Sequence, residues 1–292
     1  MSGRAARVEA QAKLNLFLRI RGRAPSGFHQ LETLFQRISL SDSLVVRTAT
    51  GRALESVGAD CGPTEKNLAW RAAVAFAEVA LWPRGFAIEI EKRIPVGGGL
   101  GGGSADAGAV LRALNALAPT PLDTTALSVI AARLGSDVPF LASEYVTAIG
   151  LGRGEQLVPF APLPARELIL VLPGFPVSSA DAFGWYAAVH GSVPASTEAP
   201  QSITSQLDWN LVELLAANDL EAVVTAHHPE IGSAVNTLTR AGLKIARMTG
   251  SGSTVFGVLD RPRQLVLPWK GVPPTLIAVR TVERVASVEV IA

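Results

Sequence analysis

Cysteine, tyrosine and methionine are scarce in this chain of 292 residues, which has one cysteine and two each of the others. The single cysteine, Cys61, excludes a disulfide within the chain and is typical of a reducing compartment. No partner in the sequence marks Cys61 as a nucleophile. The first ten residues lack an apolar segment, so we expect no signal peptide and a cytoplasmic location.

Neither sign of charge predominates. Lys and Arg number 26, Asp and Glu number 25, and no basic stripe or charged block occurs. This balance argues against nucleic acid and a membrane surface as partners. Hydrophobic residues make up 48% of the chain, yet no uncharged apolar run approaches the ~20 residues of a membrane span. The length suits about two domains.

Several familiar catalytic and cofactor-binding motifs are missing. No Gly-Lys pair occurs, which excludes a Walker A loop, and the His-Arg-Asp and Asp-Phe-Gly signatures of protein kinases are absent. A Gly-x-Ser-x-Gly elbow followed by Asp and His is missing as well. The stretch His227-His228-Pro-Glu230 has no i, i+4 histidine pair and no further ligands, so we expect no protein-bound metal.

What the sequence does contain is a run of six glycines between positions 97 and 103, followed by an apolar helical pattern over 104–117. Ser104 is the expected N-cap, and Asp106 lies in the first turn. A glycine loop that opens a helix binds anions, because unpaired amides and the helix dipole both favour phosphate. The alternative is a flexible hinge, which would lose much conformational entropy without a use.

The letters Gly97-x-Gly99-x-x-Gly102 also satisfy the dinucleotide-binding pattern. That pattern requires a strand before the loop, a second strand after the helix and an acidic residue closing that strand. Here the helix runs into a loop at 118–122 and then into another helical pattern. A Rossmann oxidoreductase is therefore a lesser alternative, which a lack of NAD binding would remove.

Hydrophobic periodicity predicts an irregular alternation of strands and helices. Residues 8–20 alternate as a half-buried strand, which places Lys13 and Asn15 on one face, about 7 Å apart. The other expected strands are 31–39, 43–49, 84–92, 166–172, 244–249, 254–259 and 275–281, with a hairpin over 144–159. The expected helices are 66–80, 104–117, 123–134, a short one after Asp137, 180–189, 209–217, 219–227 and 230–241, with a Ser- and Pro-rich loop over 191–206.

The proline-rich stretch 159–164 is the expected linker, which predicts an N-terminal domain over 1–160 and a C-terminal domain over 161–292. Strands and helices do not alternate regularly, and antiparallel pairing is expected. The predicted fold class is therefore α+β and not a doubly wound sheet.

The stretch from Pro95 to Ser104 resembles the ATP loop of the GHMP small-molecule kinases, which include galactokinase, homoserine kinase and mevalonate kinase. Other stretches resemble this family at matching order and spacing: Ala12-Lys-Leu-Asn-Leu16 with Gly27-Phe-His-Gln-Leu-Glu-Thr33, Gly135-Ser-Asp-Val-Pro139, and Met248-Thr-Gly-Ser-Gly252. Together they run through most of the chain. They are most similar to the members that phosphorylate a cytidine-diphosphate polyol in the non-mevalonate isoprenoid pathway. The resemblance implies two domains with ATP and substrate in the cleft between them.

The resemblance also implies that the γ-phosphoryl group of ATP moves to the 2-hydroxyl of that polyol, with Mg²⁺ carried by the nucleotide. Asp137 falls on the catalytic aspartate of these kinases, and Lys13 falls on a lysine beside that carboxylate and the acceptor hydroxyl. Such a base accepts the hydroxyl proton, while the cation stabilises charge on the transferring group. Without the resemblance, Asp137 is an ordinary N-cap and Lys13 a solvated lysine.

The implied ATP contacts are Asn67, Lys92, Pro95, Gly97, Gly98, Gly99, Leu100, Gly101, Gly102, Gly103, Ser104 and Ala105. The implied substrate contacts are Asn15, Phe28, His29, Ser179 and Phe183. Phe28 replaces the tyrosine usual in the family, so its ring can stack on cytosine without the phenolic hydrogen bond, while His29 reads the edge of the base. The alternatives are a loop histidine beside a core phenylalanine, a core role for Phe183 and a surface role for Lys92.

Other functions remain open. Another kinase of the superfamily, acting on homoserine, a sugar or a mevalonate intermediate, would not need the pair Phe28-His29. A nucleotide-binding regulator without catalysis would not need both Lys13 and Asp137. The stretch Gly250-Ser-Gly252 is either a loop that supports the phosphate site or a hairpin turn.

Overall fold

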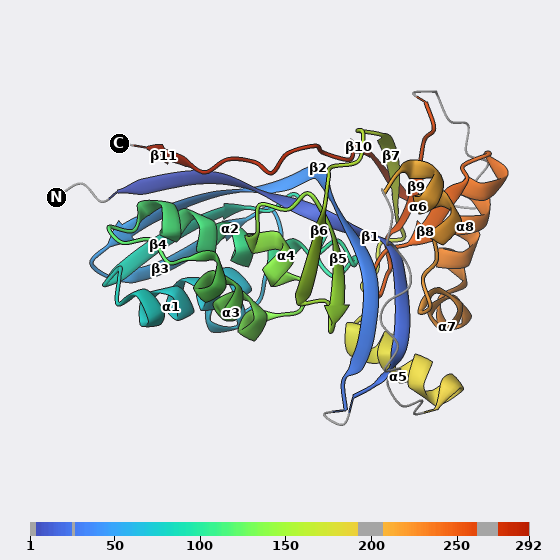
Figure 1. Cartoon of the computed structure of the whole chain (residues 1–292), viewed down its shortest axis with the longest axis horizontal. Coiled ribbons are helices and arrows are strands. Elements are labelled where there is room, and N and C mark those ends of the chain that lie inside the picture. The colour runs from blue at the N-terminus through green and yellow to red at the C-terminus, as the bar shows by residue number, and fades with distance from the viewer. Residues whose placement is uncertain (1–3, 25–26, 192–206, 262–273, 292) are drawn as a thin grey trace.

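The computed structural model describes residues 4–24, 27–191, 207–261 and 274–291, which form two sheets with helices packed around them (Figure 1). Nearly all of the expected 191–206 loop lies outside the described residues. The predicted α+β class is confirmed, because the sheets are largely antiparallel and the helices do not alternate regularly with the strands.

Seven of the described strands form the first sheet. They are β1 (Ala5–Arg23), β2 (His29–Ala49), β3 (Arg52–Val57), β4 (Gly85–Glu91), β5 (Thr147–Gly152), β6 (Gln156–Phe160) and β11 (Glu289–Ile291). Their order is β11-β1-β2-β4-β3, while β5 pairs with β2 and with β6. The pairs are antiparallel except for β3 with β4.

The second sheet has the order β10-β7-β9-β8 and is antiparallel. Its strands are β7 (Glu167–Leu172), β8 (Ile245–Met248), β9 (Val255–Val258) and β10 (Thr275–Arg280). The described helices on this side of the molecule are α5 (Ser179–His190), α6 (Trp209–Leu215), α7 (Glu221–His227) and α8 (Pro229–Arg240) (Figure 1).

The remaining described helices lie together on one face of the first sheet (Figure 1). They are the 3₁₀ turn η1 (Thr64–Lys66), α1 (Leu68–Ala80), α2 (Gly102–Leu117), α3 (Thr124–Leu134) and α4 (Val138–Ala142). We call the first sheet with η1 and helices α1 to α4 the first half of the molecule, and the second sheet with helices α5 to α8 the second half. Helix α2 is central to this layer, because it packs on β1 and β2 and also on α1, α3 and α4. Its residues from Ala105 to Leu114 are buried all round, which is why the helix carries so few charges.

Strands β1 and β2 are long enough to join the two halves. The far end of β1 contacts the segment before α7: the Leu18 amide donates to the Ala217 carbonyl at 2.8 Å, and the Asp219 amide donates to the Leu18 carbonyl at 3.0 Å. The C-terminal segment runs from the second sheet back to the first, where β11 pairs with β1 (Figure 1). One buried core extends from Leu14 in the first sheet to Phe256 in the second.

Several predicted boundaries were wrong. The expected strands 31–39 and 43–49 are the single strand β2, because its polar middle stays paired with β1 from Ser41 to Ser43. Strands β3 and β11 were not predicted, since both are short and mostly exposed. Helix α2 begins at Gly102 after Gly101, a cap with a φ of 75°, so Ser104 lies inside the helix and is not its N-cap.

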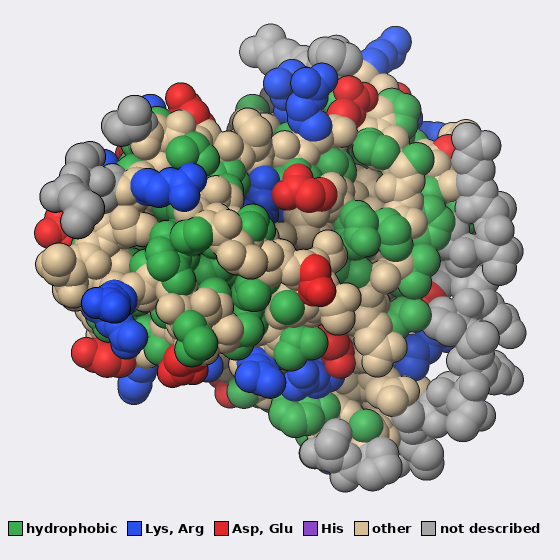
Figure 2. All heavy atoms as spheres, turned by 60° about the vertical axis from the view of Figure 1, so that its left-hand side comes forward, with side chains coloured by type: hydrophobic (Ala, Val, Ile, Leu, Met, Phe, Trp, Pro, Cys, Tyr) green, Lys and Arg blue, Asp and Glu red, His purple; other side chains and the backbone are tan. Residues whose placement is uncertain are grey.

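The surface carries both signs of charge. On the face drawn in Figure 2, Lys and Arg side chains lie among Asp and Glu side chains and hydrophobic ones. None of the described helices combines the length and the apolar character that a membrane crossing needs.

Candidate active site

A cavity of about 640 Å³ lies between the two halves of the molecule. The first half contributes β1, β2, the residues from Lys92 to Asp106, and the turn before α4. The second half contributes residues 177–179 and 250–251, together with Phe183 on α5. The cavity has the size and the position between domains that are typical of small-molecule sites.

The glycine run lines this cavity on one side and packs against the second half on the other. Gly97 and Gly99 have φ angles of 74° and 78°, in the left-handed region that favours glycine. A Cβ atom on Gly99 would lie 2.3 Å from the Thr249 carbonyl oxygen, and one on Gly97 would lie 2.5 Å from the Pro176 Cβ atom. Glycine is therefore required here both by backbone conformation and by close packing.

Hydrogen bonds hold the loop by its carbonyl groups. The Val177, Thr254 and Lys13 amides donate to the carbonyl oxygens of Gly97, Gly98 and Leu100, at 3.3, 3.2 and 3.0 Å. Within the described part of the chain, the amides of residues 97–101 donate to no protein acceptor, and the first amides of α2 have no intrahelical partner. Donors are thus left available along a loop that lines the cavity, which is the arrangement of a phosphate site.

Lys13 and Asp137 meet at this cavity. The Lys13 Nζ atom lies 3.1 Å from the Asp137 Oδ2 atom, and their side chains are 4% and 29% exposed. The predicted juxtaposition of these two residues, which are far apart in the sequence, is therefore found. Lys13 is buried although its strand was expected to be half-buried, because the Leu100 carbonyl and the second half of the molecule cover the polar face of β1.

A chain of hydrogen bonds fixes the Asn15 amide next to Lys13. The Lys13 ammonium donates to Asn15 Oδ1 at 2.6 Å, and Asn15 Nδ2 donates to the Thr33 hydroxyl at 2.8 Å. That hydroxyl donates its own proton to the Phe17 carbonyl at 2.6 Å, so it can only accept from Asn15. The Asn15 carbonyl oxygen consequently faces Lys13.

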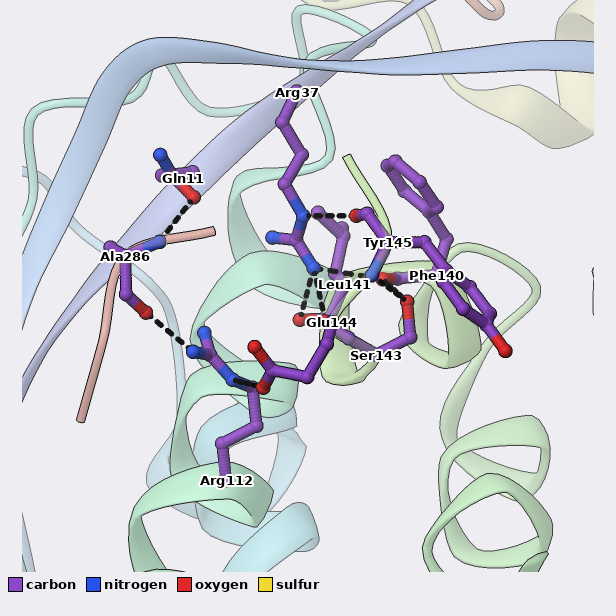
Figure 3. Close-up of polar contacts among 9 residues, drawn as sticks. All are labelled: Gln11, Arg37, Arg112, Phe140, Leu141, Ser143, Glu144, Tyr145 and Ala286. Carbon is purple, nitrogen blue, oxygen red and sulfur yellow. Dashed lines mark hydrogen bonds and ion pairs between the residues drawn. The ribbon is translucent and has the colours of Figure 1, made fainter. Parts of the chain in front are cut away.

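Arg37 on β2 anchors the short helix that follows Asp137 (Figure 3). Its Nε atom donates to the Tyr145 carbonyl at 2.9 Å, and Nη2 donates to the carbonyls of Phe140, Leu141 and Ser143 at 2.8, 3.0 and 3.0 Å. A cation at the C-terminal end of a helix also interacts favourably with the helix dipole. Because Arg37 pairs with Lys13 across β1 and β2, one strand pair positions both members of the Lys13–Asp137 pair.

Arg37 is buried, and among the described residues its guanidinium donates to backbone carbonyls and to no carboxylate. Burial, followed by the charge of nearby Arg112, lowers the pKa of Arg37 to about 9, while Glu144 acts in the opposite direction. The guanidinium therefore stays charged at neutral pH. Arg112 itself donates to Glu144 at 3.0 Å and to the Ala286 carbonyl, which ties the C-terminal segment to α2 (Figure 3).

Lys92, expected at the phosphate or the ribose, is held by two carboxylates. Its ammonium donates to Asp42 and, at 2.7 Å, to Asp106 of α2. The Asp42 carboxylate also accepts from the backbone amides of Arg93 and Ile94, which lead into the glycine loop. This cluster, Asp42–Lys92–Asp106, therefore ties the chain just before the loop to the helix that follows it. Lys92 still lines the cavity.

The charges of this cluster influence one another. Burial lowers the pKa of Lys92, but the Asp106 and Asp42 carboxylates outweigh this effect and raise the pKa overall. Burial raises the pKa of Asp106 to about 7; Lys92 opposes this shift and Asp42 adds to it. The Asp106 Oδ1 atom has no hydrogen-bond partner, which agrees with a carboxyl that is costly to ionise.

A group of aromatic residues lies next to the cavity, and one of them, Phe183, lines it. His29 stacks on Phe183 of α5, with ring centroids 5.2 Å apart and an angle of 21° between the planes. Burial, followed by the charge of Arg23, lowers the pKa of His29, which favours the neutral ring. The Phe28 side chain is 57% exposed, and the Arg153 guanidinium lies 5.3 Å from its ring centroid. Phe28 and Phe183 do not face each other as a pair.

The structure brings most of the predicted site residues to one cavity. Those that line it are Lys13, Asn15, Asn67, Lys92, Pro95, Gly97, Gly98, Gly99, Leu100, Gly101, Gly102, Gly103, Ser104, Asp137, Ser179 and Phe183. Three others do not line it. The Ala105 amide is used within α2, since it donates to the Gly101 carbonyl at 2.7 Å. Phe28 and His29 do not line the cavity, but each contacts a residue that does: Phe28 contacts Arg153, and His29 stacks on Phe183.

Sequence reasoning missed other residues of the cavity wall. Lys66 precedes Asn67, Arg153 lies in the turn between β5 and β6, and Thr33 supports Asn15. A lysine in a short 3₁₀ turn and an arginine in a hairpin turn have the sequence context of ordinary surface residues. Only Thr33 had a usable signal, because it belongs to the stretch Gly27–Thr33 that carries the family resemblance.

Comparison with protein families gives two matches. The GHMP kinases N terminal domain matches residues 67–144, and the GHMP kinases C terminal domain matches residues 204–267. Solved structures agree. A homoserine kinase from Cytophaga hutchinsonii has a TM-score of 0.65 and covers 98% of this chain and 97% of its own, which at 16% identity shows a shared fold. The class of protein is therefore an ATP-dependent small-molecule kinase of the GHMP type.

Relatives with a higher sequence identity to this chain identify a particular family within that class. A 4-diphosphocytidyl-2-C-methyl-D-erythritol kinase from Solibacter usitatus is 40% identical over 258 residues, covering 87% of this chain and 81% of that protein. The one from Pelotomaculum thermopropionicum is 37% identical and covers 93% and 96%. A crystal structure of 4-(cytidine 5'-diphospho)-2C-methyl-D-erythritol kinase is 36% identical, with a TM-score of 0.69 and coverage of 88% and 91%. The chain belongs to this kinase family.

Proposed function

We propose that this kinase transfers the γ-phosphoryl group of ATP to the 2-hydroxyl of 4-diphosphocytidyl-2-C-methyl-D-erythritol, the acceptor that the names of its relatives indicate. The observation that carries the proposal is the Lys13–Asp137 pair, which faces the same cavity as the glycine loop. Phosphoryl transfer to an alcohol needs a phosphate cradle and a proton acceptor at the alcohol within one enclosed space.

ATP would lie along the glycine loop and the start of α2. The unpaired amides of residues 97–101 would receive phosphate oxygens, and the helix dipole would favour their negative charge. Asn67 would meet the adenosine, although its side chain already caps α1 by accepting from the Ala69 amide at 2.9 Å. Lys92 would act from within its carboxylate cluster, so we propose that its main effect on the nucleotide is to hold the loop in place.

At the reacting end, Asp137 would accept the proton of the acceptor hydroxyl as its oxygen attacks the γ-phosphorus. Its carboxylate is partly exposed toward the cavity, whereas Lys13 is buried beneath it. The Lys13 ammonium would stabilise the negative charge that develops on the hydroxyl oxygen and the transferring group. Asn15 would hold that ammonium in place and offer its second amide hydrogen to the polyol.

At the other end, His29 and Phe183 would bind the cytosine. These rings stack on each other in the structure, so a base would enter by separating them or by stacking against the outer face of the pair. A neutral His29 can both donate and accept, which suits the mixed edge of cytosine. Ser179, whose hydroxyl lies 3.1 Å from that of Ser251, would support the acceptor from the first turn of α5.

Mg²⁺ would arrive on the nucleotide. Among the described residues, no group of three or more His, Cys, Asp or Glu is arranged to hold a metal ion. The Ser104 hydroxyl and the Asp137 carboxylate line the cavity and are oxygen donors of the kind that Mg²⁺ accepts. Bound there, the ion would neutralise phosphate charge.

The domain division and the location also remain proposals. We propose domains over 1–160 and 161–292, with the addition that β11 completes the sheet of the first domain. We propose a cytoplasmic enzyme acting on small molecules, with neither nucleic acid nor membrane as a partner, because its charges are balanced and it has one cysteine.

A coupled assay of ADP release tests the proposal. The purified protein is supplied with Mg²⁺, ATP and one acceptor at a time: the cytidylylated methylerythritol, homoserine, galactose or mevalonate. We expect turnover with the first alone. Turnover with one of the other three would identify a different kinase of the superfamily. ATP binding without turnover on any acceptor would favour a nucleotide-binding regulator.

A further inference from the structure

The cations that line the cavity differ in how closely they are paired with carboxylates. Among the described residues they are Lys13, Lys66, Lys92 and Arg153. Lys13 is paired with Asp137, and Lys92 lies between two carboxylates. Lys66 precedes Asn67 at the end proposed for adenosine. At the aromatic end, this leaves Arg153 as the cation that can respond to a ligand.

Arg153 lies in the hairpin turn between β5 and β6, between the two ends of the proposed acceptor site. On one side, its guanidinium is 5.3 Å from the Phe28 ring centroid. On the other side, a Cβ atom on neighbouring Gly154 would lie 3.8 Å from the carbonyl oxygen of Ser136, the residue before Asp137. The turn that carries Arg153 therefore adjoins the residue before Asp137, and the Arg153 guanidinium adjoins the Phe28 ring, which lies outside the cavity lining; the order is Asp137, Arg153, Phe28.

That order matches the chemistry of the proposed acceptor. A cytidine-diphosphate polyol has its reacting hydroxyl at one end, its base at the other and two negatively charged phosphates between them. We propose that Arg153 binds this diphosphate, and the inference rests on the proposed function. It adds a residue that determines the preference for a diphosphate-bearing acceptor.

The local contacts of Arg153 suit this role. Its side chain is 42% exposed, and its Nε atom lies 3.7 Å from a Glu155 carboxylate oxygen, beyond hydrogen-bonding distance. An exposed ion pair of that kind is weak and is readily exchanged for a phosphate. The Phe28 ring supports the guanidinium by a cation–π contact while leaving its N–H groups free. A planar guanidinium can bind two phosphate oxygens at once, which a lysine cannot.

Binding of CDP and of cytidine to wild type and to Arg153→Met tests the inference. Both ligands carry the base, but only CDP carries the diphosphate. We expect wild type to bind CDP more tightly than cytidine, and the variant to lose roughly tenfold or more in CDP affinity, the size expected for charge-assisted hydrogen bonds. Cytidine affinity and the KM for ATP should stay unchanged. Arg153→Lys should recover part of the CDP affinity, since lysine restores the positive charge but cannot bind two phosphate oxygens at once.

Arg47→Met is the matched control, because Arg47 is a half-exposed arginine beside a glutamate, Glu89, away from the cavity. It should leave both affinities as in wild type. An Arg153→Met variant that binds CDP as wild type does, or that loses equal affinity for CDP and for cytidine, would overturn the inference while the proposed function stands. If wild type binds neither ligand, the cytidylylated acceptor itself is wrong.

Discussion

The nucleotide side and the acceptor side of the cavity are built differently. On the nucleotide side, the glycine loop is held by three carbonyl hydrogen bonds, and its two ends are joined through the Asp42–Lys92–Asp106 cluster. On the acceptor side, Phe28 is largely exposed, and His29 stacks on Phe183, where the base would bind. The proposed phosphate site is preformed, whereas a base would have to separate His29 from Phe183 or stack on the outer face of that pair.

This difference follows from the ligands. A triphosphate needs many donors in fixed positions, and donors that are fixed in advance need no reorganisation during the reaction. A cytosine ring needs flat surfaces, which a few mobile side chains can supply. Lys13 and Asp137 lie where the two sides meet, and the Arg37 anchor fixes them to the rigid side.

The largest effect is expected from substituting Asp137, which lies where the nucleotide side and the acceptor side meet. Asp137→Asn removes the proton acceptor while keeping the size of the side chain, so kcat should fall by at least ~10²-fold. ATP affinity, measured by titration calorimetry, should stay near normal because the glycine loop is untouched. Full activity in this variant would falsify the assignment of Asp137 as the base.

The next effect separates the nucleotide side from the acceptor side. Gly99→Ala places a Cβ atom 2.3 Å from the Thr249 carbonyl oxygen at a φ of 78°, so the loop has to move. We expect the KM for ATP to rise roughly tenfold or more, since a left-handed alanine alone costs about 1–2 kcal/mol. The KM for the acceptor should change much less.

Gly103→Ala is the control for that substitution. Gly103 lies in the first turn of α2, and a Cβ atom there would meet only Leu68, at an ordinary 3.6 Å. It should have a much smaller effect than Gly99→Ala. Equal losses would mean that added bulk in the cavity, and not the left-handed conformation at Gly99, is what weakens ATP binding.

A smaller effect is expected on the acceptor side. His29→Ala removes a stacking ring and a hydrogen-bonding edge, so the KM for the cytidylylated acceptor should rise roughly tenfold, with the KM for ATP unchanged. His190→Ala serves as the control, because His190 stacks on Tyr186 of the same helix and does not line the cavity. An unchanged acceptor KM in His29→Ala would point to an acceptor without cytidine.

The pH dependence of stability tests the rigid side without any ligand. Because burial raises the pKa of Asp106 to about 7, the folded state binds its proton more tightly than the unfolded chain does. Stability should therefore fall as the pH rises from about 4 to about 7. Between pH 5 and pH 8 this group contributes a loss of roughly 2–3 kcal/mol.

Asp106→Asn cannot ionise and should remove that part of the decline. Urea unfolding of wild type and variant at the two pH values measures the difference. Asp60→Asn, at an exposed loop position, should keep the pH dependence of wild type. If Asp106→Asn also keeps it, the Asp106 carboxyl is not protonated in the folded protein near neutral pH.

Local signals in the sequence were enough to predict most of the regular elements, although not β3 and β11. Alternation gave β1, and helical spacing gave α2 and α3, because each has one face or more in the core. Boundaries depended on less visible features. Ser104 has the right chemistry for an N-cap, but Gly101 takes that position because only glycine readily adopts its left-handed conformation.

The site was predictable to the extent that its residues lie in contiguous motifs. Lys13 and Asp137 were paired through the family resemblance, and the structure places them in contact. The partners of Lys92 were not predictable. Asp42 is 50 residues away on another strand, and nothing in its local sequence distinguishes it from a surface aspartate. Arg37 was missed for the same reason, since a charged residue within an apolar strand gives no sign that four backbone carbonyls surround it.

The most direct test is a crystal structure with a non-hydrolysable ATP analogue and the cytidylylated acceptor bound together. We expect the terminal phosphate to lie between the amides of the glycine loop and the Asp137 carboxylate, with the acceptor hydroxyl hydrogen-bonded to that carboxylate. A triphosphate bound away from residues 97–103, or an acceptor hydroxyl that faces another residue, would contradict this expectation.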